Sequence, residues 1–177
     1  MRIAATSLLR YNKLFTDLAG VNRLTYEQKE FLMSVEQVAR DLITNMTDVE
    51  KTKAHLTADA VASGGVLPKP MPAIEAFKLI GGLKTAFPDL KFEVQQVTVN
   101  GNQATVKVQW GGTNTGPLSL PMPGMPNIPP TGKKVSVKDA FVVTVQGDKV
   151  SHLQVESPAD GGIPGALAQL GVKMPGM

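Results

Sequence analysis

The chain contains no cysteine among its 177 residues. Disulfide bonds, zinc–thiolate sites and cysteine nucleophiles are therefore excluded, and thiols give no indication of the cellular compartment. No segment approaches the roughly 18 consecutive apolar residues that a membrane-spanning helix requires. Residues 1–9 are too few and too often polar for a secretory signal. We therefore expect a cytoplasmic protein without a membrane partner.

Aromatic residues and excess charge are also scarce. Aromatic residues make up 5% of the chain, so aliphatic residues and methionine must form the core. The formal net charge is +3, and the basic residues are scattered, with Lys133-Lys134 as the only adjacent pair. Nucleic-acid-binding proteins usually cluster Lys and Arg on one face, so the sequence argues against a nucleic-acid partner. Its two histidines are too few for a multi-histidine metal site.

The first half of the chain has the spacing of helices. Thr25 and Gln28 fit a capping box, in which two side chains satisfy free backbone N–H groups. Apolar residues then recur at helical spacing over 31–46, which predicts a helix with one apolar face. Two further helices are predicted over 48–56 and 73–87.

After residue 88 the period of the pattern changes to two. Alternating apolar residues predict strands over 92–99, 104–110, 135–145 and 150–155. Asn100-Gly101 predicts a tight hairpin between the first two strands, because both residues accept a positive φ. Helices followed by an antiparallel meander predict an α+β fold, with the helices packed on one face of a curved sheet. Such a sheet leaves a mostly apolar pocket at its open end, where ligands commonly bind.

Five short pieces follow one another along this pattern. They are Ala-Phe-Pro-Asp-Leu at 86–90, Gly-Thr-Asn-Thr-Gly at 112–116, Pro-Thr-Gly-Lys-Lys-Val-Ser-Val at 130–137, Gly-Asp-Lys-Val at 147–150 and Gln-Leu-Gly at 169–171. In this order they resemble a SnoaL-like polyketide cyclase domain, within the nuclear transport factor 2-like superfamily. The resemblance covers residues 25–172 and leaves 1–24 as an N-terminal extension and 173–177 as a tail.

The resemblance implies a cone-shaped α+β fold, with a curved antiparallel or mixed sheet wrapped around the N-terminal helices. It also implies a homodimer through the sheet, and aldol ring closure of a polyketide ester without a metal or other cofactor. Two positions depart from the family pattern. Asn114 occupies the position of a histidine, and Ser157 the position of the catalytic aspartate. Asp160 takes the acidic role only if the loop is shifted by three residues.

Asp139 is the most informative single residue. Alternation places its carboxylate on the same strand face as Phe141 and several valines. A buried carboxylate must be paired or protonated, so Asp139 is a candidate general base with a raised pKa. The alternatives are a structural ion pair with a lysine, or a bulge that turns the side chain outward.

Four other residues are candidates beside Asp139. His152 on the last strand could exchange protons with a substrate oxygen, or be a half-exposed strand residue. Glu156 and Asp160 flank the last turn and could share a proton, or be solvated loop charges. Trp110 could stack on a flat ligand, or serve the core or an interface.

Several functions are compatible with these observations. The first is a cofactor-free enzyme that holds an apolar, carbonyl-bearing small molecule. In it Asp139 or Asp160 abstracts a proton next to the carbonyl, and Asn114 and His152 stabilise the enolate oxygen. We expect Trp110, Asn114, Phe141 and Glu156 to contact the ligand. The second is a non-catalytic binding or dimerisation module, and the third an interaction protein that uses an exposed sheet face.

Overall fold

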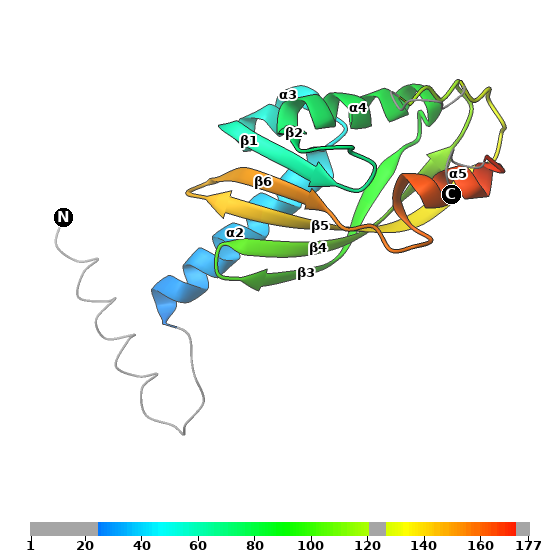
Figure 1. Ribbon diagram of the computed structural model, residues 1–177. Helices are drawn as coiled ribbons and strands as arrows, with labels where there is room; N and C mark the ends of the chain where they lie inside the picture. Colours follow the sequence, from blue (N-terminus) through cyan, green and yellow to red (C-terminus); the bar gives the residue numbers. More distant parts are fainter. Residues whose placement is uncertain (1–24, 121–126, 173–177) are drawn as a thin grey trace.

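The computed structural model describes residues 25–120 and 127–172. The predicted extension 1–24, the tail 173–177 and the limits between them and the domain stay predictions, because these segments lie outside the described residues. Figure 1 shows the elements in chain order: α2 (Tyr26–Asn45), α3 (Val49–Ala54), β1 (Leu56–Gly64), β2 (Met71–Pro72), α4 (Ala73–Ala86), β3 (Lys91–Asn100), β4 (Gln103–Thr113), β5 (Lys134–Gln146), β6 (Lys149–Val155) and α5 (Gly162–Leu170). None of these helices is both long enough and apolar enough to cross a membrane.

Helix α2 begins at the predicted capping box. The Thr25 hydroxyl accepts a hydrogen bond from the backbone N–H of Gln28, and the Gln28 side chain accepts one from the N–H of Thr25. These bonds satisfy two of the four N–H groups that lack an intrahelical partner at a helix start. The predicted apolar face is confirmed, since α2 buries Val35, Ala39, Leu42 and Ile43 and packs across β3 to β6.

The sheet is mixed and has the order β2-β1-β6-β5-β4-β3. Strands β3 to β6 form the predicted antiparallel meander, each paired with the next in the chain. Gly101 turns the hairpin between β3 and β4 with a φ of 59°, as expected for the Asn-Gly pair. Strand β1 adds to the other edge of the meander, parallel to β6, and β2 pairs antiparallel with β1. The sequence patterns do not predict β1.

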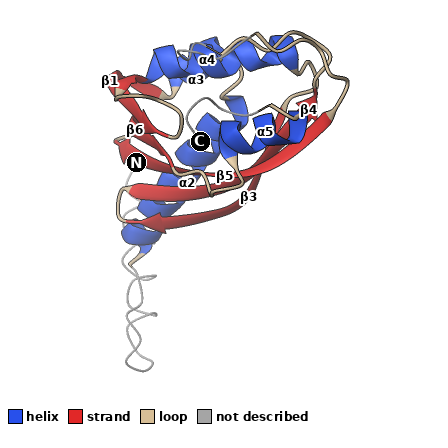
Figure 2. Ribbon diagram, turned by 45° about the vertical axis from the view of Figure 1, so that its right-hand side comes forward, coloured by secondary structure: helices blue, strands red, loops and turns tan. Residues whose placement is uncertain are grey.

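The sheet curves and encloses the core on its inner side. Figure 2 shows the strands bending around the helices, with α4 above the sheet. Alternate residues of β5 from Val135 to Val145 are all buried, which confirms the period-two pattern and places Asp139 on the inner face. The pairing of β3 with β4 shifts between Val94 and Gln96, and such bulges strengthen the local twist. The fold is therefore the predicted α+β cone with an unclosed sheet.

Candidate functional site

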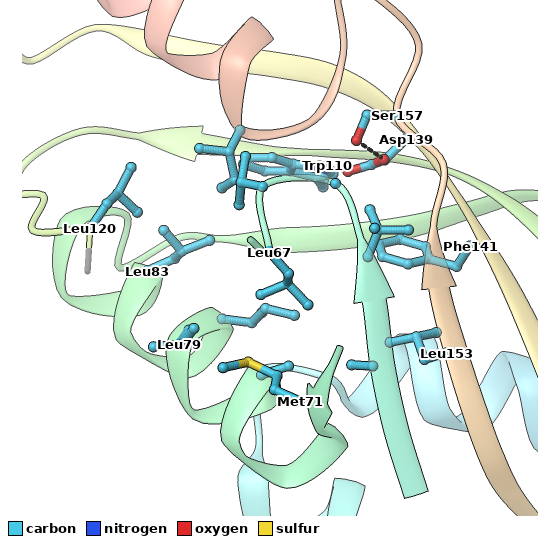
Figure 3. Close-up of a pocket in the computed structure, with 18 of the residues that line it drawn as sticks. Leu67, Met71, Leu79, Leu83, Trp110, Leu120, Asp139, Phe141, Leu153 and Ser157 are labelled. Carbon is cyan, nitrogen blue, oxygen red and sulfur yellow. Dashed lines mark hydrogen bonds between the residues drawn. The ribbon is translucent and has the colours of Figure 1, made fainter. Parts of the chain in front are cut away.

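A pocket of about 410 Å³ lies on the inner side of the sheet. It is walled by the strands, by α4 and by the segment 64–68, which begins at the last residue of β1. The lining residues Trp110, Asp139, Phe141 and Leu153 of β4, β5 and β6 are buried, whereas Leu79 of α4 and Gly64, Gly65 and Pro68 are exposed. The pocket therefore opens between α4 and this segment, and its inner end lies against β4, β5 and β6. Figure 3 shows Asp139, Ser157 and Trp110 together at one end and Met71 and Leu79 at the other.

The walls of the pocket are almost entirely apolar. Asp139 and Ser157 are the only lining residues with a carboxylate or hydroxyl group, and no Lys, Arg or His of the described residues lines the pocket. Phe92 and Trp110 stack with ring centroids 5.7 Å apart and an interplanar angle of 27°, which gives one wall a continuous aromatic surface. Such a pocket suits an apolar molecule with one polar group.

The Asp139 carboxylate is held by three donors. The Ser157 hydroxyl donates to Oδ1 at 2.8 Å, and the backbone N–H of Ala140 donates to the same oxygen at 3.0 Å. The indole N–H of Trp110 donates to Oδ2 at 3.2 Å. Asp139 has a relative exposure of 7%, so these bonds replace most of the water that would otherwise solvate it.

Burial and these hydrogen bonds act on the pKa of Asp139 in opposite directions. Burial raises the pKa of the carboxyl above its ordinary value of 3.8, while the bonds from Ser157, Trp110 and Ala140 act to lower it. Burial is the larger effect, so the net shift is upward. A carboxylate with a raised pKa is a stronger base than an ordinary aspartate.

The start of α5 closes the inner end of the site. A Cβ atom at Gly162 would lie 2.4 Å from Ser157 Oγ and 3.4 Å from Asp139 Oδ2. Gly162 also has a φ of 57°, which residues with a side chain rarely adopt. The Gly161-Gly162 pair thus lets the chain turn into α5 in contact with Ser157 and Asp139.

The structure brings three of the predicted site residues together. Asp139, Trp110 and Phe141 all line the pocket. Asn114 does not: its Nδ2 donates to the carbonyls of Gly116 and Ala86, and its Oδ1 accepts from the N–H and hydroxyl of Thr131. These bonds tie the loop after β4 to the loop before β5 and leave no free amide donor for a ligand.

His152, Glu156 and Asp160 also lie outside the pocket lining. His152 alternates with the lining residue Leu153, and its Nε2 lies 2.9 Å from Ser63 Oγ on the outer face of the sheet. Glu156 and Asp160 are exposed, and Glu156 accepts a hydrogen bond from Gln154. Ligand or catalytic roles for these three residues and Asn114 stay predictions that the pocket geometry does not favour.

Ser157 is a pocket residue, hydrogen-bonded to Asp139, that the sequence patterns miss. It lies in the loop after β6, where no periodicity indicates its direction. The only indication in the sequence was its position, because the family resemblance places the catalytic aspartate there. In the structure the carboxylate reaches this place from β5, through Asp139, and Ser157 is hydrogen-bonded to it. Among residues 25–120 and 127–172, no three His, Asp or Glu side chains are grouped as a metal site requires.

Solved structures share this fold. AclR from Streptomyces galilaeus, a proposed hydroxylase, is 20% identical with a TM-score of 0.64, covering 82% of this chain and 85% of its own. A proposed SnoaL-like polyketide cyclase from Jannaschia sp. CCS1 is 21% identical with a TM-score of 0.60, covering 78% and 91%. IdmH from Streptomyces antibioticus, a proposed polyketide cyclase, is 20% identical with a TM-score of 0.59, covering 78% and 99%.

These identities establish the likeness of fold and not a shared reaction. No curated protein matches the chain significantly. The model of the SnoaL-like polyketide cyclase family matches residues 34–155, which include β1 to β6, α4 and the carboxylate of Asp139. On this match the chain belongs to the SnoaL-like polyketide cyclase family.

Proposed function

We propose that the protein binds an apolar, carbonyl-bearing small molecule and transfers a proton from the carbon next to the carbonyl to Asp139. The observation that carries the proposal is the Asp139 carboxylate itself, which lies buried at the inner end of an otherwise apolar pocket. A group with a raised pKa in such a position is typical of a general base.

The proposed reaction needs no group beyond the carboxylate and the substrate. Asp139 takes the proton, and the electrons of the C–H bond form the enolate, whose negative charge lies on the former carbonyl oxygen. The enolate carbon can then attack a second carbonyl of the same molecule, which closes a ring and leaves an alkoxide. The proton on Asp139 returns to that alkoxide, so the carboxylate is regenerated. The apolar walls exclude water, which strengthens the electrostatic interactions of the site.

A second candidate function is binding without turnover. It is favoured by one observation, that Asp139 is the only titratable side chain among the described residues that line the pocket. Enolate formation is faster when a separate donor stabilises the oxygen, and here Trp110 and Ser157 already donate to Asp139. In this case the protein binds a small metabolite in the pocket and does not convert it.

Deuterium exchange separates the two functions. 2-Tetralone, an apolar bicyclic ketone with acidic α-protons, would be incubated with the protein in D2O, and the α-proton signals followed by NMR. We expect wild-type protein to accelerate the exchange, and Asp139→Asn to lose about 100-fold or more of that acceleration, the usual contribution of a general base.

Asp160→Asn tests the competing base in the same assay. Asp160 is exposed and outside the pocket lining, so we expect its exchange rate to stay close to that of the wild type. Loss of exchange in Asp160→Asn with normal exchange in Asp139→Asn would reject Asp139 as the base. Binding of 2-tetralone without accelerated exchange would favour binding without turnover.

We also propose that the protein is a homodimer paired through the outer face of the sheet. At the centre of this face Val142 on β5 lies between Thr105 on β4 and Gln154 on β6. These three side chains carry no charge, so two copies can face each other there without repulsion between like charges. Val142 and Thr105 are half-buried within one chain, and a second copy would cover them further.

A further inference from the structure

Within residues 25–120 and 127–172, the buried carboxylate of Asp139 has no positively charged partner. Its hydrogen-bond partners are Ser157, Trp110 and the N–H of Ala140, which are all neutral. No salt bridge within the described residues involves it, and the side chains around it in the pocket are apolar. When Asp139 is ionised, the site therefore holds a negative charge in a place that water scarcely reaches.

The hydrogen bonds around Asp139 favour its ionised form and act against the effect of burial. Each of its oxygens receives at least one hydrogen bond, and two of the three donors, the indole N–H and the backbone N–H, cannot act as acceptors. A protonated carboxyl would have to direct its own hydrogen toward one of these N–H groups or toward Ser157. Donors that converge on both oxygens stabilise the negative charge.

Aromatic rings surround the space next to this anion. Trp110 and Phe141 line the pocket from the strands that flank and carry Asp139, and Phe92 stacks on Trp110. The faces of such rings attract cations, and this attraction strengthens when the cation loses its water. An anion beside aromatic rings in an apolar cavity has the chemistry that recognises an ammonium group on an apolar body.

We propose that this pocket binds apolar amines, with the ammonium group paired to Asp139 and the hydrocarbon part against the aliphatic walls. This second ligand class does not rest on the proposed proton transfer, because it requires only the pocket and the ionised carboxylate. Anionic ligands such as carboxylates and phosphates are excluded from the same position, since Asp139 repels them and no basic residue of the described lining compensates.

A pair of ligands that differ in one group tests the proposal. 1-Aminoadamantane and 1-adamantanol share the same hydrocarbon cage, and at neutral pH only the amine is charged. Their affinities would be measured by isothermal titration calorimetry on the full chain. We expect the amine to bind wild-type protein at least about tenfold more tightly than the alcohol. Asp139→Asn should remove this preference, and Asp148→Asn, which changes an exposed turn carboxylate, should keep it.

Equal affinities, tighter binding of the alcohol, absence of binding by both ligands, or an amine preference that persists in Asp139→Asn would each overturn the proposal. Circular dichroism would establish that Asp139→Asn is folded.

A second measurement uses wild-type protein alone and does not depend on that variant. The chain has one tryptophan, so NMR shows a single indole N–H signal, from Trp110. This group donates to Asp139, and we expect the amine to shift its signal further than the alcohol does. A shift by the alcohol alone would also overturn the proposal.

The exchange assay with 2-tetralone on the same preparations distinguishes the two proposals. An amine preference without proton exchange contradicts the proposed reaction and leaves the amine site standing. Proton exchange without an amine preference contradicts the amine site and leaves the proposed reaction standing.

Discussion

Asp139 derives its properties from the contrast between its charge and its surroundings. Strand alternation is enough to predict that its side chain points inward with Phe141, and the structure places both in the pocket lining. The partner Ser157 could not be predicted by this route. Its contact with Asp139 depends on how the loop after β6 returns to β5, which is a long-range property of the fold.

The ionisation of Asp139 can be followed through Trp110, the single tryptophan of the chain, whose indole N–H donates to the carboxylate. We expect tryptophan emission to change with pH around a midpoint above 3.8, because burial raises the pKa of Asp139. Ser157→Ala should move the midpoint higher still, since it removes a hydrogen bond that favours the ionised form. A fluorescence titration of the two proteins checks both statements.

The titration has clear contrary outcomes. A midpoint below 3.8 in the wild type would mean that the hydrogen bonds outweigh burial. An unchanged midpoint in Ser157→Ala would mean that the serine does not act on the charge of Asp139. Asp139→Asn should show no such transition, which assigns the signal to this residue.

The ionisation of Asp139 and that of Asp89 change the stability of the fold in opposite directions as the pH rises. The N–H and hydroxyl of Thr113 lower the pKa of Asp89 below 3.8, so Asp89 stabilises the fold above 3.8 and loses this effect as pH falls through its folded-state pKa. The raised pKa of Asp139 has the opposite sign, and its ionisation reduces stability as pH rises above 3.8. We expect Asp89→Asn to lower the urea midpoint at neutral pH and to have no effect in acid below both pKa values. A difference that persists there would contradict this account.

The other predicted site residues show where sequence reasoning stops. His152 and Leu153 are neighbours on β6, so their side chains point to opposite faces of the sheet, and only Leu153 lines the pocket. The sequence alone does not indicate which face of β6 is turned toward the pocket. Asn114 is buried, but its side-chain hydrogen bonds go to Ala86 at the end of α4 and to Gly116 and Thr131 in the loop between β4 and β5. Residue type and spacing cannot distinguish a polar group that binds a ligand from one that holds two loops together.

At the scale of elements, helices and strands that have a strong local sequence pattern can be predicted, whereas strand β1 cannot. The capping box, the Asn-Gly hairpin and the alternation in β4 and β5 act over a few residues. Strand β1 contains small residues and Asp59, and it is held by parallel pairing with β6, which follows about ninety positions later: Val61 pairs with His152. Such pairing leaves little local signal, because its stability comes from distant residues.

The end of β1 offers a test of this element. Gly64 has a φ of 80°, and a Cβ there would lie 2.4 Å from the carbonyl oxygen of Val155 on β6. We expect Gly64→Ala to lower the free energy of unfolding by about 1–2 kcal/mol or more, from backbone strain and the clash. Urea denaturation measures this change.

Gly82 provides the matched control for Gly64. It lies in helix α4, and a Cβ there would meet nothing within 4 Å. Gly82→Ala should raise the free energy of unfolding by about 0.5–1 kcal/mol, because alanine is the better helix former. Equal effects of the two substitutions would contradict the conformational role assigned to Gly64.

At the scale of the whole molecule, the α+β class and the curved sheet follow from the order of helices and strands. The sequence alone did not define the volume of the pocket or its mouth, because these depend on how α4 and the segment 64–68 approach the sheet. Within the described residues no helix covers the outer sheet face, and we expect a second copy of the chain to cover it.

Light scattering coupled to size-exclusion chromatography tests the dimer. We expect twice the chain mass for the wild type, and Val142→Lys to give monomers, because it places charge at the centre of the outer face. Thr85→Lys is the control and should remain dimeric, because Thr85 is exposed on helix α4, which walls the pocket on the inner side of the sheet. A monomeric wild type would contradict the proposed interface.

The most direct test of the central claim, that Asp139 is the functional base of an apolar pocket, compares two pH profiles. The rate of α-proton exchange in 2-tetralone and the emission of Trp110 would be measured on the same protein across acid and neutral pH. The account predicts that the exchange rate rises with pH around the midpoint of the emission change, above 3.8, and that both changes are absent in Asp139→Asn. Exchange that follows a different midpoint, or that continues undiminished in Asp139→Asn, would contradict it.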